Sequence, residues 1–449
     1  MSISVTISSI NFNDGTRVSL DDNVIVVIVG ANNAGKSQSL RDINQMITNS
    51  DLPKVVTDVA LRKVGSEDEF MTWATERLLK TDTDNPHVHG LNASVARSTA
   101  IARWREPEKL RELANFFCVL ADTTGRLSAA NSAPTFNVLV DSPTNSIHLL
   151  YKDDALAKQI SSQFRKAFGM DLVVNKGAGN IIPLHSGIAP VLLPSEDRVS
   201  TSYLERLSKL PLLQGQGDGM RSFVGCLLHA TIGDRSIVLI DEPEAFLHPP
   251  QAKSLATMLA ETKPEGRQLF IATHSGEILR GLLDAEHNLL IIRLKRTDDR
   301  NEASLLEAGK IQNLWKDPIL RFSNIFDGLF HEQVIVCEGD ADCRFYSAIA
   351  DVLPCDDATS RRPDTMFTYG GGTGRIPLIV SALRALSVPV KVVIDFDVLG
   401  SEQNLKKIVE SFGELWTDIE PDWRALKDAV ESLAPPLTAI QVQQEINTI

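Results

Sequence analysis

The residues best suited to chemistry begin with a glycine-rich run near the amino terminus, Gly30-Ala31-Asn32-Asn33-Ala34-Gly35-Lys36-Ser37. The run matches the pattern G-x-x-x-x-G-K-[ST], in which backbone N–H groups surround nucleotide phosphates, the lysine reaches the β- and γ-phosphates and the hydroxyl holds Mg²⁺. We therefore expect ATP to be bound by Gly30, Asn32, Asn33, Ala34, Gly35, Lys36 and Ser37. Ser37 is in addition an expected ligand of Mg²⁺.

Two carboxylates of complementary use follow an apolar run at 237–240. A buried strand that ends in Asp241 can place this carboxylate on Mg²⁺. Glu242, one residue further, is the candidate base that orients or deprotonates the attacking water. Together with the glycine-rich run, these two residues suit the hydrolysis of a phosphoanhydride bond.

These residues need a strand–turn–helix unit and neighbouring buried strands to position them. The β-branched run 24–29 predicts a strand buried on both faces, and the spacing of 40–46 predicts a helix after the glycine-rich turn. Such a unit aims backbone N–H groups and the helix amino terminus at a phosphate. Before it, residues 2–20 alternate around the turn Asn13-Asp14-Gly15 and predict a hairpin.

Several motifs together resemble the ABC ATPase superfamily, in its non-transporter branch. The run from Asp241 to Pro249 has the form D-E-P-x-x-x-L-H-P, and a buried strand at 268–273 ends in His274. The resemblance implies that His274 contacts the γ-phosphate. It also implies that a second glycine-rich loop caps nucleotide on a partner subunit through Gly217, Asp218 and Gly219.

The resemblance covers residues 1–295, interrupted by a segment at about 50–205 in which no Q-loop glutamine is assigned. In this insertion we expect helices at 67–79, 107–120 and 153–168, and a hairpin from 136–140 and 146–151. His87 and His89 lie between Pro86 and Gly90, so we interpret them as part of a solvated loop rather than as metal ligands.

The last third of the chain carries a second group of carboxylates. After a polar connector and a helical bridge at 296–330, apolar strands are expected at 333–337, 365–369 and 390–394. Strand–Glu-Gly-x-x-Asp followed by strand–Asp-x-Asp is the Toprim pattern. Two adjacent parallel strands can bring carboxylates together around one or two divalent metal ions, which suits phosphodiester cleavage. The candidate ligands are Glu338, Asp342, Asp395 and Asp397.

Asp395 and Asp397 are expected to point to the same side of an extended chain. The alternative is a flavodoxin-like regulatory domain with incidental acids. An ABC-type ATPase followed by a Toprim domain resembles the OLD (overcoming lysogenization defect) family of ATP-dependent endonucleases. This resemblance implies Mg²⁺- or Mn²⁺-dependent cleavage or nicking of DNA, a homodimer formed through the ATPase and a role in bacterial defence against phage.

One departure from the family concerns the end of the chain. About fifty residues follow Asp397, and they predict helices at 405–416, 423–433 and 440–449 where the family has a further strand. Either the domain is shortened, or the Toprim centre is incomplete. In the second case the chain would be an ATPase switch that recruits or controls a separate protein effector.

Composition agrees with an α/β protein of two or three domains. The chain has 449 residues, of which 43% are hydrophobic, and no apolar run approaches the ~20 residues of a membrane span. The absence of a secretory signal and of paired cysteines predicts a cytoplasmic protein without a zinc site. The net charge of −13 excludes bulk coating of nucleic acid but not a local basic groove. The expected organisation is an ATPase domain at 1–295, a linker at 296–330 and a Rossmann-like Toprim domain at 331–449.

Overall fold

The computed structural model describes residues 3–48, 53–78, 86–285, 288–298, 300–306, 308–321, 324–353 and 362–433. The chain divides into two compact units, Met1–Trp315 and Lys316–Ile449. The first unit extends beyond residue 295 because the expected polar connector forms a hairpin. Its strands are β14 (Leu289–Thr297) and β15 (Arg300–Leu306), paired antiparallel.

The first unit is built around a six-stranded sheet with the order β15-β14-β3-β13-β12-β7. All neighbours except β14 and β15 are parallel. The three strands predicted from apolar runs are present as β3 (Ile25–Val29), β12 (Ile237–Asp241) and β13 (Gln268–Ala272). Every residue of β3 and β13 is buried, as expected for parallel strands covered on both faces.

The strand at the β12 edge, β7 (Cys118–Ala121), was not predicted. The helix expected at 107–120 is wrong except for two short turns, η1 (Arg111–Leu113) and α4 (Ala114–Phe117). Parallel pairing with β12 determines the conformation of β7, and this pairing is not visible in a local pattern.

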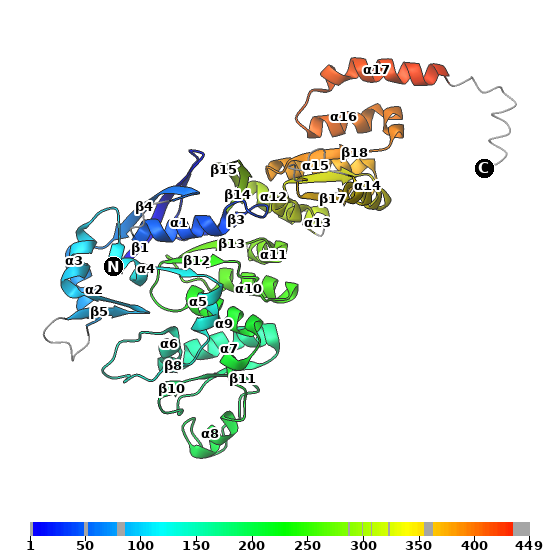
Figure 1. Cartoon of the computed structure of the whole chain (residues 1–449). Helices are drawn as coiled ribbons and strands as arrows, with labels where there is room; N and C mark the ends of the chain where they lie inside the picture. The colour runs from blue at the N-terminus through cyan, green and yellow to red at the C-terminus, as the bar shows by residue number, and fades with distance from the viewer. Residues whose placement is uncertain are drawn as a thin grey trace. The chain divides into compact units, whose positions relative to one another are not determined.

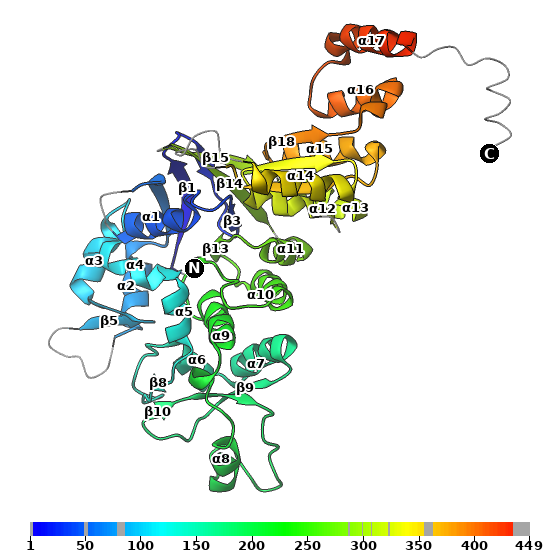
Figure 2. The ribbon, with the colours of Figure 1, turned by 45° about the vertical axis from the view of Figure 1, so that its right-hand side comes forward.

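Two layers cover the faces of the central sheet (Figures 1 and 2). On one face lie α1 (Lys36–Thr48) and a small antiparallel sheet of β1 (Ser4–Phe12), β2 (Arg17–Ser19) and β4 (Val56–Val64). Their apolar side chains form one core with alternate residues of β3 and β12. The opposite face is covered by α9 (Asp218–Thr231), α10 (Pro249–Thr262) and α11 (Gly276–Asp284).

The predicted amino-terminal hairpin is confirmed, and β4 extends it by pairing with β1. β4 and β7, which lie within the predicted insertion at about 50–205, therefore belong to the two sheets of the first unit. The remaining elements of this part are α2 (Glu67–Thr75), β5 (His87–Gly90), β6 (Ala93–Ala96), α3 (Arg97–Arg105), α5 (Thr123–Ala129), β8 (Ala133–Pro134), α6 (Ser146–Lys152), α7 (Asp154–Phe168), β9 (Asp171–Val174), β10 (Ile181–Ile182), β11 (Leu184–Gly187), α8 (Thr201–Leu207) and η2 (Leu213–Gly215).

Two predictions in this part are wrong. Residues 146–151 form helix α6 instead of a hairpin strand, because the Asn145 side chain accepts a hydrogen bond from Ile147 N at 2.8 Å and caps the helix. His87 and His89 lie in the antiparallel pair β5–β6 and not in a loop. The helices expected at 67–79 and 153–168 are present as α2 and α7.

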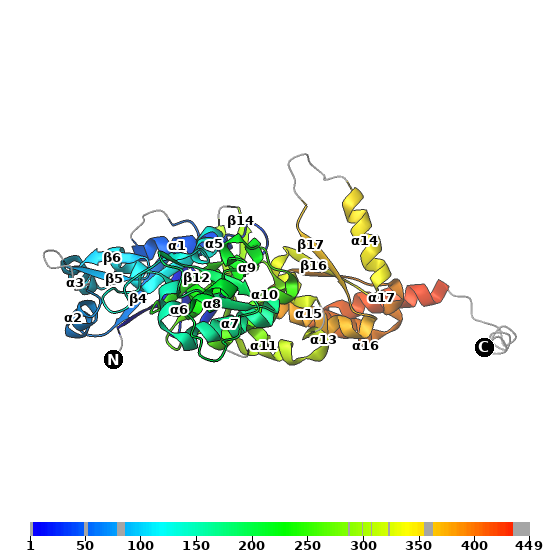
Figure 3. The ribbon, with the colours of Figure 1, turned by 90° about the horizontal axis from the view of Figure 1, so that it is seen from below.

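The second unit contains a three-stranded parallel sheet with the order β17-β16-β18. The predicted strands are confirmed as β16 (Gln333–Cys337), β17 (Thr365–Tyr369) and β18 (Val390–Val393). The two crossovers run in opposite directions, so right-handed connections place α14 (Asp340–Val352) and α15 (Ile376–Ala385) on opposite faces (Figure 3).

Further helices complete the described part of the second unit. They are α13 (Pro318–Arg321), η3 (Ile325–Phe330), η4 (Thr373–Arg375), η5 (Phe396–Gly400), α16 (Glu402–Ser411) and α17 (Trp416–Leu433), preceded at the junction by α12 (Ala308–Lys316). The helix expected at 440–449 lies outside the described residues. None of the helices in the described ranges combines the length and hydropathy needed to span a bilayer.

Candidate functional site

The glycine-rich turn follows β3 and leads directly into α1, as predicted. Gly30 and Gly35 have φ values of +147° and +98°, and a side chain at either position would collide with its neighbours. At Gly30 the obstacle is the Leu294 carbonyl oxygen of β14, and at Gly35 it is the Asn301 side chain of β15. The two glycines are therefore required by the close packing of the β14–β15 hairpin against the turn.

Lys36 is held against the turn. Its side chain is buried, and Nζ donates to the carbonyl oxygens of Gly30 at 2.9 Å and Ala31 at 3.0 Å. Burial lowers the pKa of Lys36, whereas the nearby carboxylates of Glu242, Glu244 and Asp241 raise it. The expected phosphate-binding cation thus lies beside the expected hydrolytic carboxylates.

A cavity of about 720 Å³ opens above the turn. Its size falls in the range of small-molecule sites, about 300–1,000 Å³. The lining combines the predicted turn residues and Glu242 with side chains that were not predicted, among them Lys54, Arg296 and Asn301. These basic and amide groups suit a polyanionic ligand.

Asp241 ends β12 next to the turn. Burial raises the pKa of Asp241, and a hydrogen bond with Ser37 opposes this effect. Its Oδ1 atom is buried without a hydrogen-bond partner among the described residues. A buried carboxylate oxygen beside the Ser37 hydroxyl matches the donors that Mg²⁺ prefers, so these two residues fit the predicted ion.

Glu242 has a left-handed backbone, with φ of +49°, and its N–H donates to the Ala272 carbonyl of β13 at 2.8 Å. His274 lies beside it, with Nδ1 3.6 Å from Glu242 Oε1. The two residues come from neighbouring strand ends and lie close together, and their roles as base and γ-phosphate contact stay predictions.

Glu244 is a site residue whose role was missed, although it stands in the acidic run used for prediction. Only 8% of Glu244 is exposed, and burial raises the pKa of its carboxyl. Its Oε1 accepts hydrogen bonds from Thr273 Oγ1 at 2.7 Å and His274 N at 2.9 Å, and lies 3.2 Å from His274 Nδ1. Glu244 therefore orients the histidine.

Asn301 braces the turn from β15. Its Nδ2 donates to the Ala34 carbonyl at 2.7 Å. Asn13 holds Asn301 through two hydrogen bonds, at 3.1 Å between the side-chain amides and at 2.9 Å from Asn301 N to Asn13 Oδ1. Because the segment around Asn301 was predicted to be a connector, no sequence signal indicated this contact.

The second glycine-rich loop lies at the start of α9, with Gly217 at the N-cap position. Gly219 packs against the Phe246 carbonyl, and Asp218 forms an ion pair with Arg221 at 2.9 Å. Gly217, Asp218 and Gly219 do not line the cavity above the phosphate-binding turn. The structure thus does not bring them to the nucleotide site of their own chain.

In the second unit, Glu338 follows β16 and Asp395 follows β18, so they lie at neighbouring carboxyl ends of parallel strands as predicted. Glu338 Oε2 is buried without a partner among the described residues, and Asp342 accepts a hydrogen bond from Gly339 N at 3.0 Å. The expected extended conformation at 395–397 is wrong, because Asp397 lies in η5.

The candidate metal ligands of the second unit are not gathered into a cluster. Among the residues that the structure describes, no group of three or more His, Cys, Asp or Glu side chains is arranged to hold a metal ion. Cys118, Cys226, Cys337 and Cys343 are buried free thiols, and Cys355 lies outside the described residues.

Comparison with known proteins finds a family model that matches part of the first unit. Residues 107–280 match a family model described as "AAA domain, putative AbiEii toxin, Type IV TA system". The Old nuclease of Escherichia phage P2 is 24% identical over 172 residues, which are 37% of this chain and 28% of that nuclease. The chain therefore spans little more than a quarter of this relative.

Solved structures of SMC head domains are also similar. The head bound to the ScpA C-terminal domain from Pyrococcus furiosus has a TM-score of 0.41 at 10% identity, covering 70% of this chain and 99% of that chain. The head from Thermotoga maritima has a TM-score of 0.34 at 12% identity, covering 69% and 100%. Both TM-scores lie below 0.5, and these likenesses carry no further argument.

Proposed function

We propose that the first unit of this chain is an ABC-type ATPase related to the OLD family, and that ATP hydrolysis in this unit controls a Toprim metal-dependent DNA endonuclease in the second. The observation that carries the hydrolytic part is the convergence of Lys36, Asp241 and Glu242 at the glycine-rich turn. A cation for the phosphates, a ligand for Mg²⁺ and a base for water are then within one site.

In the proposed reaction, Lys36 leaves the carbonyls of Gly30 and Ala31 and turns to the β- and γ-phosphates. Ser37 and Asp241 would hold Mg²⁺, which would neutralise phosphate charge when bound. Glu242 accepts a proton from the water that attacks the γ-phosphorus, and the bond to the β–γ bridging oxygen breaks. His274, oriented by Glu244, contacts the γ-phosphate.

The second glycine-rich loop leads to a proposal about assembly. Gly217, Asp218 and Gly219 do not line the cavity of their own chain, so we propose that they cap nucleotide on a second copy in a homodimer. Light scattering with a non-hydrolysable ATP analogue should report a dimer. A strict monomer at high concentration, with and without the analogue, would contradict this assembly.

The nuclease part of the proposal is supported by topology. Glu338 and Asp395 lie at the carboxyl ends of adjacent parallel strands, and the Glu338 carboxylate has a buried oxygen without a described partner. These oxygens, with Asp342 and Asp397, would hold Mg²⁺ or Mn²⁺ and neutralise charge during cleavage of a DNA phosphodiester. A role in defence of bacteria against phage is part of this proposal, by analogy with the family.

One observation favours a second function. Because the described residues contain no ready group of three metal-binding side chains, the second unit could be a binding module. The chain would then be an ATPase switch that recruits or regulates a separate protein effector.

A plasmid assay separates the two functions. In Mg²⁺ or Mn²⁺, with and without ATP, the parent chain should nick supercoiled DNA. Asp395→Ala should reduce nicking by about 10²-fold or more, since charge neutralisation at the transition state is lost, and should leave ATP hydrolysis near the parent rate. Asp428→Ala, on the exposed face of α17, is the matched control. A parent chain with full ATPase activity but no nicking in either metal would favour the switch.

A further inference from the structure

Arg126, in α5, is the largest fully buried side chain among the described residues, with 0% exposure. Its guanidinium donates to three backbone carbonyls: Ala121 at 2.9 Å, Glu242 at 3.0 Å and Asp241. Nε donates to the Ser222 hydroxyl at 3.1 Å. No sequence signal indicated a role for this residue.

The cost of burying the guanidinium makes this arrangement specific. A charge removed from water needs many well-placed acceptors. Arginine presents five donors in a rigid planar fork, so its position fixes the positions of the groups that accept from it. Two of the three accepting carbonyls belong to Asp241 and Glu242, the residues expected to hold Mg²⁺ and activate water.

Glu242 needs such a constraint because its left-handed backbone is unfavourable for a residue with a side chain. A conformation of this kind persists where surrounding contacts over-determine it. Three contacts hold the Glu242 peptide groups: Arg126 Nη2 and Ala245 N donate to its carbonyl, and its own N–H donates to Ala272 O. Together they set the direction in which the carboxylate leaves the backbone.

The same guanidinium contacts the helix that begins at the second glycine-rich loop. Ser222 lies in the first turns of α9, which starts at Asp218. Gly225, one turn further, packs so closely on the Arg126 backbone that a side chain there would collide with the Arg126 carbonyl. A shift of α9 would therefore move the acceptor of Arg126 Nε.

We propose that Arg126 is a positioning residue for hydrolysis, which holds the Glu242 carboxylate in its reactive orientation and couples it to α9. The inference rests on the proposed ATP hydrolysis, and Arg126 itself touches neither nucleotide nor water. Positioning of this kind affects turnover more than binding, because the phosphate-binding turn is held by other contacts.

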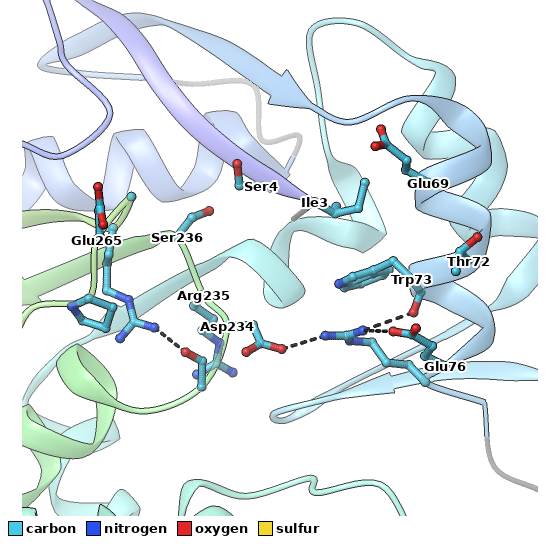
Figure 4. A pocket seen from close by; sticks show the side chains of 15 residues that line it. Ile3, Ser4, Glu69, Thr72, Trp73, Glu76, Asp234, Arg235, Ser236 and Glu265 are labelled. Atoms are coloured by element: carbon cyan, nitrogen blue, oxygen red, sulfur yellow. Dashed lines mark hydrogen bonds and ion pairs between the residues drawn. The ribbon is translucent and has the colours of Figure 1, made fainter. Parts of the chain in front are cut away.

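The matched control is Arg267, at the opposite end of α9. It is also buried, with 3% exposure, and donates to the carbonyls of Ala230 at 2.6 Å and Gly233. It precedes β13 and lines a cavity of about 620 Å³ at the amino-terminal edge of the sheet. Figure 4 shows this cavity, with Trp73 and Glu76 on one wall and Asp234 and Arg235 facing them.

The test compares steady-state ATP hydrolysis by full-length Arg126→Lys, Ser222→Ala and Arg267→Lys. Lysine keeps the charge but not the fork, so Arg126→Lys should lower kcat by about 10²-fold, with KM for ATP within about threefold of the parent value. The milder Ser222→Ala removes one acceptor and should lower kcat by about fivefold. Arg267→Lys should keep kcat within about twofold, whatever its effect on Tm.

A double-mutant cycle supplies the second readout. In a Glu242→Gln background, Arg126→Lys should change single-turnover hydrolysis by less than about twofold, because the carboxylate that it positions is already absent. Full additivity, or a parental kcat in Arg126→Lys, overturns the inference alone. Equal losses of kcat in Arg126→Lys and Arg267→Lys also overturn it. A parent chain without ATP hydrolysis overturns the proposed function and this inference together.

Discussion

Replacement of Asn301 tests whether the β14–β15 hairpin sets nucleotide affinity. Asn301 is 7% exposed, and its side-chain amide donates to the Ala34 carbonyl at 2.7 Å. In Asn301→Ala this buried carbonyl loses its donor, which costs about 1–3 kcal/mol. If this loss destabilises the conformation of the turn that binds ATP, the Kd for ATP rises by about fivefold to about a hundredfold, since each 1.4 kcal/mol of binding free energy changes Kd about tenfold.

Asn301→Asp should weaken ATP binding further. The carboxylate keeps the size of the side chain, but it presents only acceptors to the Ala34 carbonyl and adds negative charge beside the expected phosphates. Calorimetric titration with ATP and Mg²⁺ measures both effects. A Glu242→Gln background prevents turnover during the titration.

Glu302→Ala is the control. Glu302 lies on the same strand, its side chain is exposed, and its Oε2 is 3.9 Å from Lys295 Nζ. It should bind ATP within about twofold of the parent, as expected for a surface pair. A role of the hairpin in nucleotide affinity is refuted if Asn301→Ala retains both the parental Tm and the parental Kd. It is also refuted if Glu302→Ala weakens binding to the same extent.

Two further predictions concern turnover and pH. Glu242→Gln should retain ATP binding and lose hydrolysis because only the water-activating carboxylate is removed, while Lys36→Ala should weaken binding; parental hydrolysis in Glu242→Gln would show that the base is another group. Burial lowers the pKa of His229 to about 4, so the folded protein favours the neutral imidazole. The contribution of His229 to folding stability is therefore complete above the unfolded pKa of about 6.5 and is lost as pH falls towards 4. From pH 7.5 to 5 this residue should remove about 2 kcal/mol of unfolding free energy, measured with urea; an identical pH dependence in His229→Gln would contradict the assignment.

Local patterns in the sequence were sufficient for the phosphate-binding turn and for the central strands around it. β3, β12 and β13 are short apolar runs buried in a parallel sheet, and such runs carry their own signal. The spacing from Gly30 to Ser37 is equally local. For this reason the positions of Lys36, Asp241 and Glu242 were predicted before the fold was known.

Long-range packing decided how these residues are held. Arg126 reaches the Asp241 carbonyl across 115 residues of sequence, and Asn301 reaches Ala34 across 267. No sequence period or spacing predicts either contact, because the partner of a buried donor depends on which acceptors the folded chain brings close to it. β7 is likewise a strand because it pairs with β12. Asp397 is not extended because it lies in η5. Residue types and short spacings therefore determined the chemistry, whereas tertiary packing decided which side chains orient it.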